Sequence, residues 1–215
     1  MEMRTIIIWC IVGAAIGWML GMAGVQIPDW AAVGIVIALV VVIVGYHAYV
    51  LFWTKNIQLV EAYLKKRKKQ PYYALMLALA NGDLEKAERY AEQLTGKYEE
   101  ARKSALANIQ IEKNQLEEAA DIANEIKNDT VRYYNQALVA LMQGKEEQFA
   151  QAKNNVANRV LRYVLEAEKA FRQGDKKEAE QLGHLAISSA RGLQKYVLVR
   201  SLERQQKNPN RHSFF

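Results

Sequence analysis

Residues 81–94 read Asn81-Gly-Asp-Leu-Glu-Lys-Ala-Glu-Arg-Tyr-Ala-Glu-Gln-Leu94. In this stretch a Gly-Asp turn signal is followed by small and apolar residues at helical spacing. The same pattern returns three times, at Asn114, Gly144 and Gly174. With the first turn at Gly82, successive copies are 32, 30 and 30 residues apart. A constant period of this length is typical of stacked helical hairpins. The sequence therefore predicts an all-α solenoid of about four hairpins over residues 71–207.

We expect consecutive helices in this region, because it shows no alternating β pattern and Pro209 is the only proline after Pro71. The last helix has polar positions suited to capping the array. Residues 208–215 are predicted to form a flexible tail, in which Phe214-Phe215 is either a short recognition tag or a loose end. The expected helices are 71–81, 84–95, 98–113, 116–127, 130–143, 145–155, 158–173, 175–190 and 192–206.

A helix, then Gly-Asp-apolar-x-x-Ala, then a second helix resembles the tetratricopeptide repeat over roughly residues 71–190. Tyr133 and Tyr163 stand where that family has an aromatic early in the first helix, whereas Pro71 and Lys103 stand there in the other copies. The proline that usually closes a repeat is missing from all four. The family's helix-contact positions are Leu75, Ala107, Ala137 and Ala167 in the first helices and Ala87, Ala119, Phe149 and Ala179 in the second.

Two charge-free runs precede the repeats, from Thr5 to Pro28 and from Trp30 to Thr54. Each is longer than the ~20 apolar residues that a membrane-spanning helix needs. A cleavable signal peptide has a shorter apolar core and no second span directly after it. We therefore expect a transmembrane hairpin over residues 1–54, with spans at about 5–25 and 30–53.

The positions of Lys and Arg predict the topology of this hairpin. No Lys or Arg lies between the spans, Arg4 precedes the first, and six lie between residues 55 and 69. Because positive residues stay on the cytoplasmic side, both termini and the repeat domain are expected in the cytoplasm.

The second span is expected to continue as one helix of about 40 residues, since Trp30 to Lys69 contains no proline. Residues 55–70 then form a basic helical stalk that ends at Pro71. Its basic run serves as the topology signal and as a contact for anionic lipid headgroups. Residues 71–215 hold 22 Lys and Arg against 20 Asp and Glu, so no nucleic-acid partner is expected. The basic run consists of Lys65, Lys66, Arg67, Lys68 and Lys69.

The first expected span carries Gly13, Gly17 and Gly21 at intervals of four residues. Glycines so spaced line one helix face and allow another helix to approach closely. Two alternatives follow. The face packs against the second span, or it docks another membrane protein or a second copy of the chain in a homo-oligomer.

Chemistry-bearing motifs are scarce. Cys10 is the only cysteine, and His47 stands between Tyr46 and Tyr49 without a paired carboxylate. His184 has no further metal ligand at suitable spacing, and no glycine-rich phosphate loop occurs. We therefore expect neither enzymatic activity nor a metal or cofactor.

The tetratricopeptide resemblance implies that the first helix of each pair lines a concave groove for protein segments. The family's clamp for a C-terminal carboxylate uses Lys and Asn, whereas Tyr and Met stand at the corresponding positions here. A largely apolar groove favours an amphipathic helix or an extended segment. Many of these side chains are alternatively part of the core. The expected groove residues are Tyr72, Met76, Asn108, Tyr134, Leu138 and Phe171, with Glu168 on the same face.

A membrane hairpin followed by a tetratricopeptide-like domain is also similar in plan to the HemY family of bacterial inner-membrane proteins. This similarity implies a bacterial plasma membrane as the setting. The sequence thus predicts a non-enzymatic adaptor or scaffold that binds other proteins at the cytoplasmic face. The alternative is an accessory or assembly subunit of a membrane complex, bound mainly through the hairpin.

Overall fold

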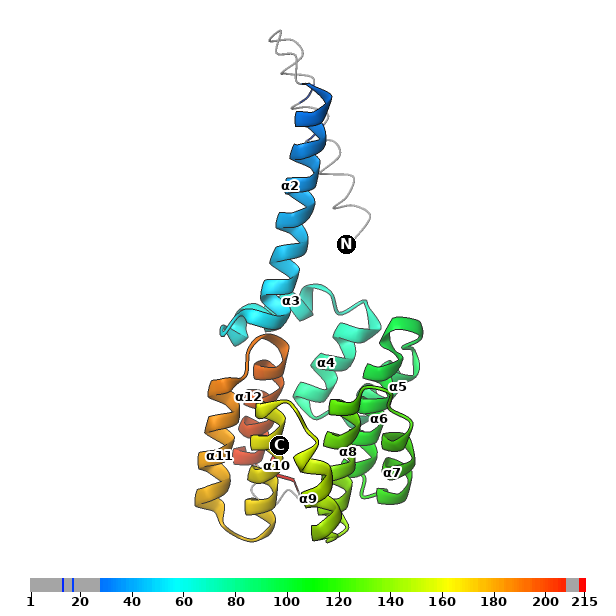
Figure 1. The fold of residues 1–215 in the computed structure, drawn as a ribbon, viewed down its shortest axis with the longest axis vertical. Helices are drawn as coiled ribbons and strands as arrows, with labels where there is room; N and C mark the ends of the chain where they lie inside the picture. Colours follow the sequence, from blue (N-terminus) through cyan, green and yellow to red (C-terminus); the bar gives the residue numbers. More distant parts are fainter. Residues whose placement is uncertain (1–12, 14–16, 18–27, 208–212) are drawn as a thin grey trace. The chain divides into compact units, whose positions relative to one another are not determined.

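The computed structural model describes residues 13, 17, 28–207 and 213–215, and this part of the chain is helical without a β-strand. The chain divides into two compact units, Met1–His47 and Ala48–Phe215 (Figure 1). The elements are α2 (Asp29–Ala48), the π-helix η1 (Tyr49–Trp53), α3 (Ile57–Lys66), α4 (Pro71–Asn81), α5 (Leu84–Glu92), the 3₁₀ turn η2 (Gly96–Tyr98), α6 (Glu99–Glu112), α7 (Leu116–Asn124), α8 (Asp129–Met142), α9 (Glu146–Asn154), α10 (Arg159–Arg172), α11 (Lys176–Ser189) and α12 (Gly192–Lys207).

The predicted helices from residue 71 onward are confirmed, with ends that agree to within three residues. The four repeated turn residues, Gly82, Asn114, Gly144 and Gly174, all have a left-handed φ of +61° to +83°. In each copy the following N–H donates to the carbonyl five residues back, at 2.8–3.0 Å. This bond ends the first helix of the hairpin and turns the chain into the second. The feature that repeats in the sequence is therefore the turn that ends the first helix of each hairpin.

The positions expected at helix contacts are buried in every copy. The six alanines among them are fully buried, as is Leu75, and Phe149 is 1% exposed. Small residues let the paired helices approach closely, and Phe149 replaces one alanine in the third hairpin, where it joins a core cluster with Leu138 and Leu165. The predicted pattern of core positions is confirmed.

The single 40-residue helix expected after the membrane segment is wrong. The chain is extended at Thr54, and α3 begins only after Asn56. The Asn56 side chain accepts hydrogen bonds from the N–H groups of Gln58 and Leu59 at 3.0 and 3.1 Å, which caps α3. The Thr54 hydroxyl oxygen accepts one from the Asn56 N–H at 3.1 Å. These side chains compete with the helix for backbone donors and so interrupt it.

Residues 55–70 belong to the compact unit and do not form a separate stalk. Val60, Tyr63 and Leu64 of α3 are buried in one core cluster with Val50, Ala80 and Tyr196, which come from η1, α4 and α12. The amphipathic spacing that suggested a continued helix is real, but the apolar face of α3 packs on the repeats.

The last helix, α12, covers more than the end of the array. It packs against α11 and also against α3, α4 and η1, so the stack of hairpins closes on its own beginning (Figure 1). Arg200 of α12 pairs with Glu61 of α3. Arg204 donates to the carbonyl oxygens of Leu79, at 3.0 Å, and of Ala80. These carbonyls lie at the end of α4, where a helix leaves acceptors without partners in its own backbone. The helix expected to cap the end of the array thus also packs on its first helices and closes the stack.

Among the described residues, one helical stretch, Val33–Trp53, is long and apolar enough to cross a membrane by length and composition. It corresponds to the second expected span. The first expected span, at about 5–25, lies outside the described residues except for Gly13 and Gly17, which are helical. The hairpin of two spans remains a prediction.

A backbone contact fixes the end of η1 to the repeats. The N–H of Gly192, the first residue of α12, donates to the carbonyl oxygen of Thr54 at 2.7 Å. A Cβ atom built on Gly192 would stand 2.0 Å from the carbonyl oxygen of Leu51, and its φ is +52°. Only glycine fits this approach of two backbones.

We therefore expect Gly192→Ala to destabilise the protein by more than Gly144→Ala in a denaturant melt followed by circular dichroism. Both substitutions place alanine at a left-handed φ, which costs about 1–2 kcal/mol. Gly144 has no heavy atom within 4 Å of its Cβ position, so it lacks the collision with Leu51. Equal losses for the two variants would contradict a tight backbone contact at Gly192.

Candidate functional site

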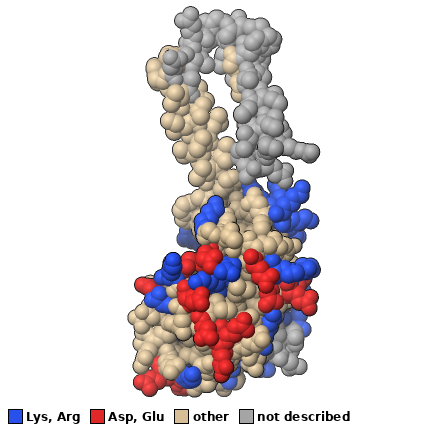
Figure 2. Space-filling model, turned by 90° about the vertical axis from the view of Figure 1, so that its right-hand side faces the viewer, with Lys and Arg blue, Asp and Glu red and all other residues tan. Residues whose placement is uncertain are grey.

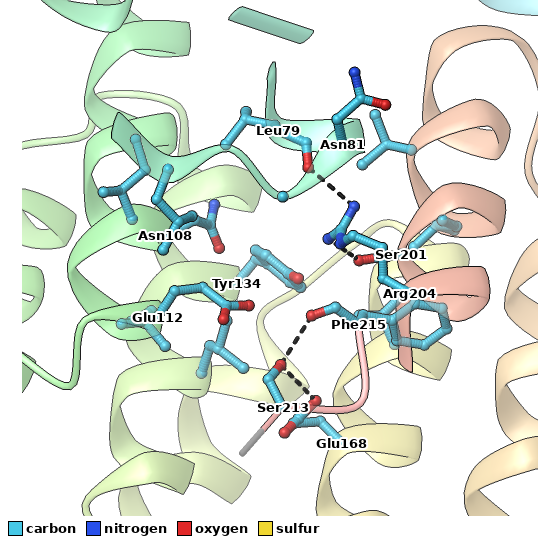
Figure 3. Close-up of a pocket in the computed structure, with 18 residues that line it drawn as sticks. Leu79, Asn81, Asn108, Glu112, Tyr134, Glu168, Ser201, Arg204, Ser213 and Phe215 are labelled. Carbon is cyan, nitrogen blue, oxygen red and sulfur yellow. Dashed lines mark hydrogen bonds between the residues drawn. The ribbon is translucent and has the colours of Figure 1, made fainter. Parts of the chain in front are cut away.

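The concave side of the repeats contains a cavity of about 440 Å³. It is lined by residues of α4, α5, α6, α8, α10 and α12 together with the C-terminal residues. Figure 3 shows Asn108, Glu112 and Tyr134 on one side and Ser201, Arg204 and Phe215 on the other. Because α12 returns to α4, the concave side is a partly open cavity between these helices, and it differs from the long groove that the sequence predicts.

Arg204 lines one side of the cavity and connects α12 to the end of α4. Besides the two carbonyl bonds to α4, its guanidinium donates to the Ser201 hydroxyl oxygen at 2.8 Å. A cation at the C-terminal end of a helix is stabilised by the helix dipole. A Cβ atom on Gly82 would meet the Arg204 side chain at 2.9 Å, so the turn after α4 and this side chain are packed together.

Glu168 is the buried acid of the site. It lies on α10 and is only 1% exposed. Its Oε2 accepts a hydrogen bond from the Phe214 N–H at 2.8 Å and one from the Ser213 hydroxyl at 3.3 Å. Its Oε1 lies 3.8 Å from Nε of Arg172, which is too long for a hydrogen bond. Burial raises the pKa of Glu168 to about 7, although the Phe214 N–H and the Arg172 charge act in the opposite direction.

Of the flexible tail expected over residues 208–215, only residues 213–215 are described, and they are packed at this cavity, whereas residues 208–212 lie outside the described residues. Ser213 and Phe214 are buried at 6% and 1% exposure. The Phe214 ring packs beside the rings of Phe171 and Phe215, at centroid distances of 5.6 and 5.0 Å. The hydrogen bonds to Glu168 and the burial of the ring together hold this end of the chain.

The cavity brings together three of the expected groove residues, Asn108, Tyr134 and Leu138. Phe171 contacts the tail, as described. Met76 and Asn108 line a second hollow between α4 and α6. Tyr72 stacks on Tyr98, with 4.9 Å between ring centroids, and packs on the core of the first hairpin. The residues expected to line one groove therefore lie in three places: the cavity, the second hollow and the core of the first hairpin.

Several residues of the site went unrecognised as such in the sequence, among them Arg204, Ser213 and Gly183 of α11, whose Cβ position lies 2.8 Å from the Phe214 ring. Gly183 had a local signal, because a glycine inside a helical pattern often marks a close approach. Arg204 had none, since its partners lie about 125 residues earlier in the chain.

The basic run lies at the end of α3 and in the turn that follows. Lys65 pairs with Glu61 at 2.7 Å, and the Arg67 guanidinium lies 3.9 Å from the centroid of the Tyr63 ring. Lys66, Lys68 and Lys69 are exposed and make no ion pair with the described residues. These three are the members of the run that remain available to headgroups.

The glycine face of the first expected span has two described members. No heavy atom within 4 Å is found for a Cβ on Gly13 or Gly17, and Gly21 lies outside the described residues. Over the part of the chain that the structure describes, no group of three or more His, Cys, Asp or Glu is placed to hold a metal ion.

Comparison of the chain with protein-family models, with curated proteins and with solved structures found no match.

The raised pKa of Glu168 predicts a pH-dependent stability. Because the pKa in the folded state lies above the ordinary 4.5, the protonated carboxyl stabilises the fold fully below pH 4.5. This contribution is lost as the pH rises through about 7. Between pH 5 and 8 the free energy of unfolding of the wild type should fall by on the order of 3 kcal/mol relative to that of Glu168→Gln. Denaturant unfolding at each pH measures this difference.

Glu180→Gln, at an exposed carboxyl of α11, is the matched control and should follow the wild-type curve. Parallel curves for the wild type and Glu168→Gln would show that Glu168 does not ionise in this range.

Proposed function

We propose that the chain is a membrane-anchored helical-repeat adaptor that binds protein partners at the cytoplasmic face of a bacterial plasma membrane. The observation that carries the anchor is the distribution of exposed apolar side chains. Among the described residues, all the large ones that are exposed lie between Trp30 and Trp53, apart from Leu185. A continuous apolar surface of this size is unfavourable in water and suits a lipid environment.

The surface of the repeats supports the second half of the proposal. Figure 2 shows Lys and Arg interspersed with Asp and Glu on one face of residues 48–215. Mixed charge of this kind suits a water-exposed domain and does not favour a polyanion. The partly open cavity and its apolar lining supply a place for a protein segment, and the site residues offer no recognisable set of catalytic groups.

The basic residues support the cytoplasmic location. Lys66, Lys68 and Lys69 come shortly after the apolar helix and are exposed, which suits the positive-inside rule and contact with anionic headgroups.

A specific observation also favours the second candidate, an accessory or assembly subunit bound through its membrane segment. The concave side is closed by α12 and holds the chain's own C-terminus, which leaves less of it open to a partner. The apolar face of α2 is extensive and exposed, with Val36 and Val40 among its members. In this case the partner would be another membrane protein.

Photo-crosslinking in intact membranes separates the two candidates. A photoreactive amino acid replaces Asn108 in the cavity, Val40 in α2, or Lys177, an exposed residue of α11 that serves as the control. The adaptor predicts a discrete crosslinked protein from position 108 and none from 177. The accessory subunit predicts it from position 40 alone. Crosslinks of equal yield at all three positions would contradict both.

A further inference from the structure

Ser213 and Phe215 line the cavity, and Phe214 is buried beside it among residues of α10, α11 and α12. These three residues contact α10, α11 and α12 and are separated from the end of α12 at Lys207 by the segment 208–212. Within the described residues, their polar bonds to the rest of the protein are made to one side chain, the Glu168 carboxylate. The other bond of the Ser213 hydroxyl goes to the Phe215 carbonyl oxygen at 2.8 Å, within the segment itself.

The pocket for the Phe214 ring is built into the helices. Gly183 lies in the interior of α11, where glycine costs about 1 kcal/mol relative to alanine. A Cβ atom on it would stand 2.8 Å from Cε1 and 3.2 Å from Cζ of Phe214. The ring also packs with Ala167, Ala179 and Leu202. The missing side chain at Gly183 is therefore explained by the aromatic ring that occupies its place.

The chemistry of the pocket defines what it can bind. A buried carboxylate accepts a main-chain N–H and a hydroxyl, and an apolar recess next to it accepts one aromatic ring. Such a site selects an extended segment with a hydroxyl residue followed by an aromatic one. A cationic clamp for a C-terminal carboxylate has the opposite charge and would select a different ligand.

We propose that the pocket formed by Glu168, Gly183 and Phe171 is a binding site for an extended Ser/Thr-Phe-Phe segment of a partner protein, and that the C-terminus of the chain occupies it until the partner arrives. This inference rests on the proposed adaptor function, because it names the segment that the adaptor binds. The tail is tethered close to the pocket, so its effective concentration is on the order of millimolar. A partner segment must therefore compete with the tail.

The test uses the full membrane-inserted chain in nanodiscs and a version shortened to end at His212. The probe is a fluorescein-labelled peptide of residues 208–215, followed by fluorescence anisotropy. The peptide should bind the shortened chain at least tenfold more tightly than the full chain, because no tethered tail competes with it. Replacing Phe214 of the peptide by alanine should abolish binding.

Two substitutions in the shortened chain locate the site. Gly183→Leu fills the recess for the ring and should remove peptide binding, whereas Gln181→Leu places the same leucine side chain at an exposed position of α11 and should leave it intact. In the full chain, Gly183→Leu should also speed the release of Phe215 and Phe214 by carboxypeptidase at least tenfold.

Four results would each overturn the proposal. Loss of helical circular dichroism in the shortened chain would make the tail a permanent part of the core. Equal binding of the peptide to both versions would exclude competition by the tail, and no binding to the folded shortened chain would exclude the site. A dimer formed by the full chain and lost on shortening would make a second copy the occupant in place of a partner.

Failure here is distinguishable from failure of the adaptor function. Peptide binding without a crosslinked partner at position 108 would retain the pocket and contradict the adaptor. A crosslinked partner without peptide binding would do the reverse.

Discussion

The packing of α12 against the first helices is the contact on which the rest of the repeat unit depends. Arg204 donates to carbonyls at the end of α4, Arg200 pairs with Glu61, and Tyr196 is buried with Val60 of α3. An open stack of hairpins leaves a face uncovered at each end, which capping repeats normally protect. Here one helix covers both ends. As a result, the concave side becomes a partly open cavity of about 440 Å³ lined by α4, α5, α6, α8, α10 and α12 and by the C-terminal residues.

The same helix links this cavity to residues 49–54, the segment through which the chain enters the repeats. Its first residue, Gly192, bonds to Thr54, and its middle and end line the cavity through Ser201 and Arg204. The π-helix η1 and the extended residue Thr54 lie between the apolar helix and α3, so the chain enters the repeats through an irregular segment held by backbone contacts. The observed contacts make residues 49–54 part of the folded unit.

The parts that could be predicted from the sequence are those that short-range forces determine. The hairpins were predictable because Gly82 and its three counterparts require a left-handed backbone, and because alanines at helix contacts recur with the same period. Asn56 carried a capping signal that was missed, since the apolar spacing on either side of it was continuous. Arg204 of α12 bonds to a residue 125 positions earlier, and Phe214 bonds to one 46 positions earlier. No local sequence pattern encodes contacts between residues so far apart. Of the groove residues, Asn108, Tyr134 and Leu138 line the cavity, whereas Tyr72 stacks on Tyr98. The tetratricopeptide resemblance and the two-span hairpin remain predictions.

The buried carboxyl explains why an acid, and not the basic residue typical of a carboxylate clamp, suits this cavity. An ionised Glu168 is costly in an apolar site, and burial raises its pKa for that reason. Either protonation state can nevertheless hold the tail. The carboxylate accepts from both the Phe214 N–H and the Ser213 hydroxyl. The protonated acid still accepts from the Phe214 N–H and can donate its own proton to the Ser213 oxygen, which frees the hydroxyl proton for the Phe215 carbonyl. A lysine at this position would have only donors and would leave the Phe214 N–H without an acceptor. The requirement for an acceptor in both states therefore favours Glu168 over any cationic residue, and it ties the choice of side chain to the main chain of the segment that is bound.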